Sequence, residues 1–325
     1  MTQKIVSILD KRRFRLFFEK YNFFVMDNNN SNFKLTKIEN KKIHDDYINS
    51  ISLFPSGKII SVSADKSIKI WTNNFNLLQV IPNAHIFSII NIEIINEHNF
   101  ITCSFDQTIK IWIKEENKFK IKDNILNAHK EGIIKVLYFK NILISCSFDK
   151  KIKLWEKNKE NKYQTITIIS NINSIRTIYL LEDKNIFISS GFNGTNFYNL
   201  NNLDNFFSIK HITCYNYGDT IKRIDNDRII ISSDNIIKII SISNKTIIKE
   251  IDNKFGCLGI FILKEKGLFF ISGFSKNFKI YRCDNYECIY IEKDSHNNFI
   301  KGFVQINNCS IVSYSYDKTI NIWFF

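Results

Sequence analysis

The sequence predicts an all-β fold, a seven-bladed β-propeller of four-stranded antiparallel blades closed into a ring by an N-terminal strand. The first observation is a recurring heptapeptide that begins with Asp and ends with Trp at residues 65–71, 106–112, 149–155 and 317–323. Weaker copies begin at Asn193, Asp234 and Ser275, so the seven starts lie 41, 43, 44, 41, 41 and 42 residues apart. A repeat of this length with a strand ending on Trp is typical of propeller blades.

The second observation is the order of features within each repeat. In the first repeat, strand-like residues 47–53 and 58–63 flank a Pro-Ser-Gly turn, and a tight turn then leads to the strand that ends on Trp71. A polar loop leads to a fourth strand, as at residues 163–169 in the third repeat. Such β-branched and aromatic runs with regular turn signals predict an all-β chain. The chain has only 10 Gly, so Asn is expected at turns that need the left-handed conformation.

The third observation is that the last repeat stops just after its third strand. Residues 33–39 alternate apolar and polar side chains, which predicts a half-buried strand. This strand can supply the missing outer strand of the last blade and so remove an open sheet edge. The predicted propeller therefore spans residues 32–325, with blade turns near residues 65, 106, 149, 193, 234, 275 and 317.

Residues 1–31 precede the repeats and have two interpretations. They form either a basic, aromatic-rich docking arm or a short cap over a blade edge. The cap is favoured because the aromatic pairs at residues 17–18 and 23–24 are unfavourable in water.

The charge balance is basic, with 45 Lys and Arg against 32 Asp and Glu, a net charge of +13. Such a charge is compatible with nucleic acid or an anionic membrane as a partner. The lysines are scattered, however, and a nucleic-acid site gathers charge on one face, so we favour a compositional origin. Contact of the basic residues 11–15 with a membrane surface is the weaker alternative. Apolar runs stay below the ~18 residues of a membrane span, so we expect no transmembrane segment. The expected compartment is the cytoplasm, with the nucleus as an alternative.

The motifs of the common catalytic and metal sites are missing from the sequence. The seven cysteines form no CxxC pair, and Cys103 and Cys146 occupy the same strand position, as small buried side chains do. Neither a disulfide framework nor a zinc site is implied. Phosphate-binding Gly-rich loops, HExxH, GxSxG and EF-hand loops are missing too. We expect no metal, no cofactor and no enzymatic activity.

These repeats resemble the WD40 (beta-transducin-like) family over about residues 33–325, strongly in repeats 1, 2, 3 and 7 and weakly in repeats 4 to 6. The resemblance implies a structural tetrad of His, Ser or Thr, Asp and Trp in each strong blade. The matching residues are His44, Asp65 and Trp71; His85, Asp106 and Trp112; His129, Asp149 and Trp155; and His296, Asp317 and Trp323. The hydroxyl is Ser61 or Ser63, Thr102 or Ser104, Ser145 or Ser147, and Ser313 or Ser315.

The sequence departs from the family pattern after the Trp. Thr72, Ile113, Glu156 and Phe324 stand where the family usually has Asp, and the Arg that some members use to dock on a ubiquitin-ligase adaptor is missing. A role as a ubiquitin-ligase substrate receptor is therefore disfavoured. Repeats 4 to 6 lack the tetrad His and Trp, and we expect Phe197, Tyr198, Ile240 and Tyr281 to replace the packing.

A His, an Asp and a Ser together also suggest a catalytic triad. The constellation occurs four times at a His-to-Asp separation of 20 or 21 residues. A catalytic group is needed once, whereas a structural hydrogen-bond network is needed in every blade. We therefore interpret the four sets as structural.

The residue before the turn Asp faces one mouth of the ring in WD40 propellers, and here that series is rich in aromatics. The resemblance, together with the third residue after each His, gives these partner-binding candidates: Tyr47, Phe105, Phe148, Phe192, Phe274, Phe299 and Tyr316. Exposed aromatics gathered in one place are typical interface anchors. The alternative is that each ring folds onto its own turn and covers the tetrad.

The sequence thus predicts a non-catalytic protein–protein interaction scaffold within a multi-subunit complex, which binds peptide or protein partners at an aromatic-lined mouth. One alternative is an RNA-associated propeller of a ribonucleoprotein complex, which would use the positive charge with the aromatics. Another is an accessory subunit of an assembly, trafficking or signalling machinery.

Overall fold

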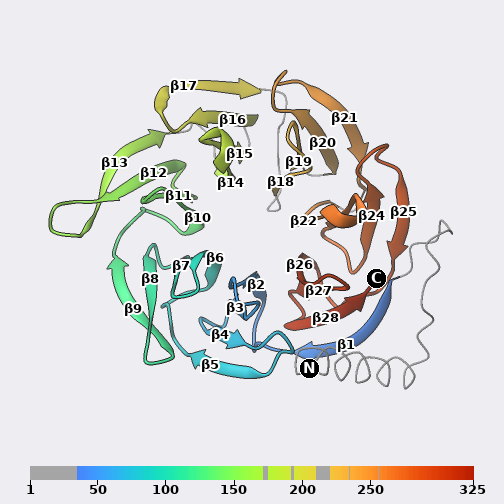
Figure 1. Ribbon diagram of the computed structural model, residues 1–325, viewed down its shortest axis with the longest axis horizontal. Coiled ribbons are helices and arrows are strands. Elements are labelled where there is room, and N and C mark those ends of the chain that lie inside the picture. Colours follow the sequence, from blue (N-terminus) through green and yellow to red (C-terminus); the bar gives the residue numbers. More distant parts are fainter. Residues whose placement is uncertain (1–34, 171–174, 192–193, 210–219, 234, 255) are drawn as a thin grey trace, which may run out of the picture. The chain divides into compact units, whose positions relative to one another are not determined.

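Seven four-stranded antiparallel sheets stand as blades around a common axis (Figure 1). The computed structural model describes residues 35–170, 175–191, 194–209, 220–233, 235–254 and 256–325. The prediction of a seven-bladed all-β propeller is confirmed. Within the described residues, helix is confined to two short 3-10 turns, η1 (Glu182–Lys184) and η2 (Lys264–Lys266).

Each blade places one strand at each of four distances from the axis (Figure 1). The innermost strands are β2 (Ile48–Leu53), β6 (Ile89–Asn96), β10 (Ile133–Phe139), β14 (Ile175–Leu181), β18 (Ile221–Arg223), β22 (Gly259–Leu263) and β26 (Ile300–Asn307). The second strands are β3 (Ile59–Ser63), β7 (Asn99–Ser104), β11 (Ile142–Ser147), β15 (Ile186–Gly191), β19 (Arg228–Ser233), β23 (Leu268–Ser272) and β27 (Ser310–Ser315). The third strands are β4 (Ile68–Trp71), β8 (Ile109–Glu115), β12 (Lys151–Lys157), β16 (Gly194–Asn199), β20 (Ile236–Ser241), β24 (Phe278–Arg282) and β28 (Thr319–Phe324). The outermost strands are β5 (Leu77–Ile81), β9 (Lys118–Ile125), β13 (Tyr163–Ser170), β17 (Asn202–Ile209), β21 (Ile247–Asp252), β25 (Cys288–Glu292) and β1 (Thr36–Lys42).

The last blade takes its outermost strand from the start of the propeller, as predicted. Strand β1 pairs antiparallel with β28, from Thr36 opposite Phe324 to Lys42 opposite Thr319 (Figure 1). The strand begins three residues later than the predicted range 33–39. The alternation of side chains favoured the earlier range, but the length of β28 decides where pairing occurs. Pairing therefore continues through two charged residues, Lys41 and Lys42, that the pattern excluded.

The core consists of apolar layers between neighbouring blades. Blades 1 and 2, for example, bury Val62 and Ile70 against Ile92, Phe100 and Trp112. The layer between blades 6 and 7 is aromatic: the Phe278 ring lies 5.2 Å from that of Phe303 and 5.3 Å from that of Trp323. Each large side chain buried in this way contributes about 1.5–3 kcal/mol. The inter-blade layers, rather than the single blades, therefore hold the ring together.

Blades 4 and 5 differ from the others at the turn between their second and third strands. In blade 2, Phe100 on the second strand pairs with Trp112 on the third. The corresponding pairs are Phe187 with Tyr198 in blade 4 and Ile229 with Ile240 in blade 5. The partners in blades 4 and 5 are one residue closer in the sequence, so these two hairpins are one residue shorter. The turn residues themselves, at 193 and 234, lie outside the described residues. The replacements predicted for the missing Trp side chains are confirmed as buried core: Phe197, Tyr198, Ile240 and Tyr281.

Asn takes several of the turn positions that require a left-handed backbone, as predicted. Six of the 16 non-glycine residues with positive φ in the described part of the chain are Asn: Asn83, Asn117, Asn127, Asn141, Asn161 and Asn185. The same conformation recurs just after each tetrad Asp, where Lys66, Gln107, Lys150 and Lys318 have φ between 66 and 74°. These turns therefore hold side chains where Gly would be the easier choice.

The thiols of Cys103 and Cys146 are unpaired and fully buried, as predicted for small apolar side chains. Burial raises the pKa of the Cys146 thiol to about 12. Within the part of the chain that the structure describes, there is no helix of the length and apolar character needed to cross a membrane.

Candidate functional site

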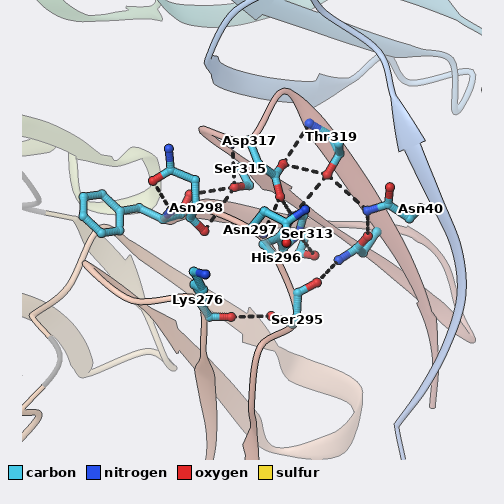
Figure 2. A network of polar contacts seen from close by, with 12 residues as sticks. Asn40, Lys276, Ser295, His296, Asn297, Asn298, Ser313, Ser315, Asp317 and Thr319 are labelled. Atoms are coloured by element: carbon cyan, nitrogen blue, oxygen red, sulfur yellow. Dashed lines mark hydrogen bonds and ion pairs between the residues drawn. The ribbon is translucent and has the colours of Figure 1, made fainter.

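The predicted tetrads lie where the second and third strands of a blade meet the loop that enters it. Figure 2 shows three members of the tetrad of blade 7: His296 Nδ1 lies 2.9 Å from Asp317 Oδ2, and Nε2 lies 2.7 Å from Ser313 Oγ. Trp323 Nε1 donates to the same Ser313 hydroxyl at 2.9 Å. A chain of hydrogen bonds thus crosses the blade from the indole to the carboxylate.

Blades 1, 2 and 3 repeat this geometry, with His-to-Asp distances of 2.8 to 2.9 Å. The structure also decides between the two candidate hydroxyls in each blade. The tetrad members are Ser61, Thr102, Ser145 and Ser313. The second hydroxyls, Ser63, Ser104, Ser147 and Ser315, instead accept from the backbone N–H of the turn Asp and donate to a carbonyl of the entering loop.

Burial disfavours the charged form of the tetrad histidines in blades 1, 2 and 3. Burial lowers the pKa of His44, His85 and His129 and outweighs the opposing effect of the neighbouring carboxylates. A neutral ring can donate from Nδ1 to Asp and accept at Nε2 from the Ser or Thr hydroxyl. Burial also raises the pKa of Asp65, but hydrogen bonds from His44 and Ser67 outweigh it, so the pKa stays well below its usual range.

The tetrad Asp also fixes the path of the entering loop. Its Oδ2 accepts from the backbone N–H of the residue after the His, at distances of 2.8 to 3.0 Å in all four blades. The residue before the Asp then donates its N–H to the carbonyl of the third residue after the His, as Phe105 does to Ser88 at 3.1 Å and Tyr316 to Phe299 at 3.0 Å. Two segments about 20 residues apart are thereby held side by side at one end of the blade. This contact brings the two predicted aromatic series together.

The aromatic side chains pair across neighbouring blades. Tyr47 of blade 1 stacks on Tyr316 of blade 7, with ring centroids 4.8 Å apart. Phe299 of blade 7 meets Phe274 of blade 6 edge to face at 5.5 Å. In blades 2 and 3, the Phe105 and Phe148 rings lie 5.8 Å apart. Tyr47, Phe105 and Phe299 are 44, 43 and 37% exposed, and the other three are half-buried.

Two glycines leave the space that two of the aromatic rings occupy. A Cβ on Gly132 would come within 2.6 Å of the Phe105 ring, and a Cβ on Gly256 would come equally close to Phe274. Gly132 lies in the entering loop of blade 3, so the Phe105 ring of blade 2 packs on the neighbouring blade rather than on its own turn. Each of these two rings packs one face on a loop, and Phe105 still leaves a large fraction of its surface in solvent.

Two apolar residues of the same face were not predicted from the sequence. Ile86 and Phe87 follow His85 in the entering loop of blade 2 and are 71 and 57% exposed. The signal was available, because the other three tetrad blades carry charged or amide side chains at these positions: Asp45 and Asp46, Lys130 and Glu131, Asn297 and Asn298. A cation also borders the site, since the Arg176 guanidinium of β14 lies 5.7 Å from the Phe148 ring.

We call the following set the aromatic mouth: Tyr47, Ile86, Phe87, Phe105, Phe148, Phe274, Phe299 and Tyr316. Among the predicted partner-binding residues, Phe192 lies outside the described residues, as do residues 1–31 with their basic stretch 11–15. The mouth therefore consists, in the described chain, of residues from blades 6, 7, 1, 2 and 3, which follow one another around the ring.

The comparison with protein families agrees with this geometry. Residues 36–72, 77–112 and 122–156 match the family model described as WD domain, G-beta repeat. This chain contains three WD40 repeats within a seven-bladed propeller. Each matched range contains the outermost strand of one blade followed by the first three strands of the next. The WD40 repeat therefore straddles two blades, which is why closure of the ring requires β1.

A solved WD40 propeller has the same fold. The crystal structure of the WD40 beta propeller domain of Doa1 matches with a TM-score of 0.73 and 15% sequence identity, over 89% of this chain and 96% of that chain. A comparison with curated proteins found no match. WD40 propellers generally act as protein-interaction scaffolds. A fold alone does not assign that role to one chain, because function depends on the individual site.

Proposed function

We propose that this WD40 propeller is a non-catalytic scaffold of a multi-subunit complex and binds a peptide or protein partner at the aromatic mouth. The observation that carries the proposal is the run of partly exposed apolar side chains over five consecutive blades. Ile86 and Phe87 are the most exposed of them, and Phe105 is exposed as well. Monomeric proteins seldom gather such groups on one face unless the face is used. The cytoplasm, with the nucleus as an alternative, is the compartment we propose.

The geometry of the mouth suits tight recognition. Phe105 and Phe274 are held against glycines, and Tyr47 is stacked on Tyr316, so their rings lose little conformational freedom on binding. Rigid aromatic anchors with one free face are typical of interface hot spots. A partner that inserts apolar side chains between these rings would bury them without ordering a loop first.

The tetrads support a structural rather than a catalytic role for the His and Asp side chains. All four have nearly the same distances, and their His side chains are buried within the blade walls. A satisfied network of this kind rigidifies the turn that carries the aromatic residue.

The test is affinity capture of the tagged protein from its native cells, with and without nuclease, alongside the triple variant Phe105→Ser, Phe148→Ser and Phe274→Ser. We expect specific protein partners that survive nuclease and are lost with the triple variant. A matched control replaces three exposed aliphatic residues of outer strands with Ser: Leu78, Ile168 and Ile291.

The outcomes separate the candidate functions. Partners lost with the mouth variant but kept with the outer-strand variant would support the proposal. Partners lost only after nuclease would favour the ribonucleoprotein alternative, in which the exposed Lys66 and Lys150 beside the mouth would contact phosphates. A collapse of the melting temperature of the mouth variant alone would show that the rings are core.

A further inference from the structure

The inner wall of the ring is polar and links neighbouring blades. Each innermost strand is the edge of its sheet, so one row of its backbone groups has no partner strand. Side chains of the preceding blade meet these groups: Asn49 Nδ2 donates to Ile89 O at 2.8 Å, Val136 N donates to Asn91 Oδ1 at 3.2 Å, and Tyr138 N donates to Glu93 Oε1 at 3.3 Å. Side chains at these positions therefore face the axis of the ring.

Three charged side chains of this wall converge on the axis: Glu93 on β6, Lys135 on β10 and Lys222 on β18. Glu93 interacts electrostatically with both lysines, and the two lysines repel each other. Strands β6 and β10 are neighbours in blades 2 and 3, whereas β18 belongs to blade 5, so Lys222 can interact with Glu93 and Lys135 only across the axis. Glu93 and Lys135 are half-buried and Lys222 is exposed, so water reaches all three.

The environment opposes the charged forms of these groups. Burial raises the pKa of the Glu93 carboxyl to about 7. Burial, together with repulsion from Lys222, lowers the pKa of the Lys135 ammonium to about 8. Desolvation inside the ring lowers the pKa of Lys222 as well, although water still reaches its side chain. Two ammonium groups thus lie near Glu93, a weak carboxylate whose pKa a second carboxylate, Glu182, raises further. Protonation of Glu93 leaves an excess of positive charge that an added anion would relieve.

A cavity of about 630 Å³ is lined by Lys222 together with other residues of blades 4, 5 and 6. Strand β18 has only three residues, and the cavity lies between it and the neighbouring inner strands. Tyr179 and Phe261 line its walls together with Lys264. Arg223 is already neutralised, since its guanidinium binds both carboxylate oxygens of Asp183 at 2.6 and 3.0 Å. Lys222 and Lys264 are the other cations that line the cavity, and Glu182 is a further anion of the lining.

We propose that the axis of the ring binds a phosphate group, held by Lys222 and Lys135, with any organic part of the ligand in the cavity between Tyr179 and Phe261. A phosphate dianion matches two ammonium groups in charge, and its oxygens accept several hydrogen bonds at once. The same phosphate could be free or part of an organic ester, and the cavity volume is within the range of small-ligand sites. This site is separate from the aromatic mouth, and neither proposal depends on the other.

The test is calorimetric titration of the full chain with three probes: inorganic phosphate, pyrophosphate and adenosine monophosphate. We expect saturable binding that Lys222→Gln and Lys135→Met each weaken by at least about tenfold. The control is Lys249→Gln, which removes the same charge from an exposed position on β21 and should leave affinity unchanged. Stronger binding of the nucleotide than of inorganic phosphate would assign an organic phosphate, and equal binding would assign free phosphate.

Proton uptake provides a second measurement. A bound anion should raise the pKa of Lys135, so binding at pH 8 should take up protons, seen as different heats in Tris and HEPES buffers. Affinity should fall from pH 7 to pH 9 as Lys135 loses its proton. The other groups that interact with this site are Glu93, Glu182 and Lys222, and the thiols of Cys103 and Cys146 beside Lys135.

The proposal is overturned by an absence of saturable heat with all three probes, by equal affinity of Lys222→Gln and the unmodified chain, or by affinity that does not change between pH 7 and pH 9. Circular dichroism checks the fold of each variant. If Lys135→Met does not fold, the exposed Lys222→Gln variant decides the question alone.

Discussion

Asn40 on β1 donates a hydrogen bond of 2.5 Å from Nδ2 to Oδ1 of Asn321 on β28. Asn321 donates in turn to the carbonyl of Ser295, the residue before the tetrad His of blade 7. Blades 1, 2 and 3 have Lys at the matching position, and each Lys donates to the same carbonyl of its own blade: Lys69 to Ile43, Lys110 to Ala84 and Lys153 to Ala128. A Lys has no acceptor to offer. Asn at this one position therefore connects the closing strand to the tetrad.

The variant Asn321→Lys should weaken ring closure. It keeps a donor for the Ser295 carbonyl but removes the acceptor for Asn40 and adds a cation close to Lys37, which binds the same carbonyl at 3.1 Å. We expect a loss of about 1–2 kcal/mol in the free energy of unfolding, measured by urea titration. The control is Asn40→Ala in the Asn321→Lys background. This second substitution should lower the free energy of unfolding by little more. An Asn321→Lys variant as stable as the unmodified chain would contradict this account.

Removal of the tetrad hydroxyl should lower the free energy of unfolding by more than the loss of so small a group would suggest. Thr102→Val keeps the shape of the side chain but leaves the Trp112 indole N–H and the His85 Nε2 without partners in a fully buried site. Unsatisfied buried polar groups cost about 1–3 kcal/mol each, so we expect a loss of about 2–4 kcal/mol in urea unfolding. Thr102→Ser restores the hydroxyl that the other three tetrads use and should lose less than about 1 kcal/mol. Equal losses of stability for Thr102→Val and Thr102→Ser would indicate that packing of the side chain, rather than its hydroxyl, stabilises the tetrad.

Stability should fall as the pH drops below neutral. The pKa of His44, His85 and His129 is lowered from the ordinary 6.5, so below that pH the unfolded chain binds more protons than the folded one. Glu93 acts in the opposite direction: its pKa is raised from 4.5 to about 7, so the folded state gains stability from it as the pH falls through this range. The variant Glu93→Gln should therefore lose stability more steeply between pH 7.5 and 5.5. Urea titrations at three pH values in this range measure the slope, and a flatter slope for the variant would refute the assignment.

The effects of substitutions at Gly132 and Phe105 on stability should be coupled. A Cβ at residue 132 would meet the Phe105 ring at 2.6 Å and its Cα at 3.2 Å, so Gly132→Ala should displace the ring and cost about 1–2 kcal/mol. In a Phe105→Ser background the same change should cost much less, because most of the obstructing atoms are gone. A double-mutant cycle in urea measures the coupling, and strictly additive losses would show that the ring does not rest on this glycine.

The repeat spacing was sufficient to predict the blade count and the closing strand, because a propeller blade cannot bury its faces alone. The choice between Ser61 and Ser63 could not be made from sequence. Residues two apart on a strand point to the same side, and only the position of the His ring in the folded blade selects one. The boundaries of β1 depended in the same way on its distant partner.

The aromatic residues were identified by their position in the repeat, but their pairing was not. The stacking of Tyr47 on Tyr316 depends on the approach of the first and last blades, which no local pattern records. Ile86 and Phe87 were missed because the prediction followed features that repeat from blade to blade, whereas these positions are apolar in only one of the four tetrad blades. Glu93, Lys135 and Lys222 were missed for another reason: each looks like an ordinary surface charge on a half-buried strand until the ring brings three blades together.

Closure of the ring also sets an order of events during synthesis. Strand β1 is the first described strand to leave the ribosome, yet Asn40 and its partner Asn321 are 281 residues apart. At translation rates of about 5–20 residues per second, β1 waits roughly a quarter of a minute to a minute for β28. Through that interval β1 is without its partner strand and the growing chain has an open end. A ribosome that stalls within the last blade therefore leaves a nascent chain with two unprotected edges, a form that chaperones would be expected to recognise.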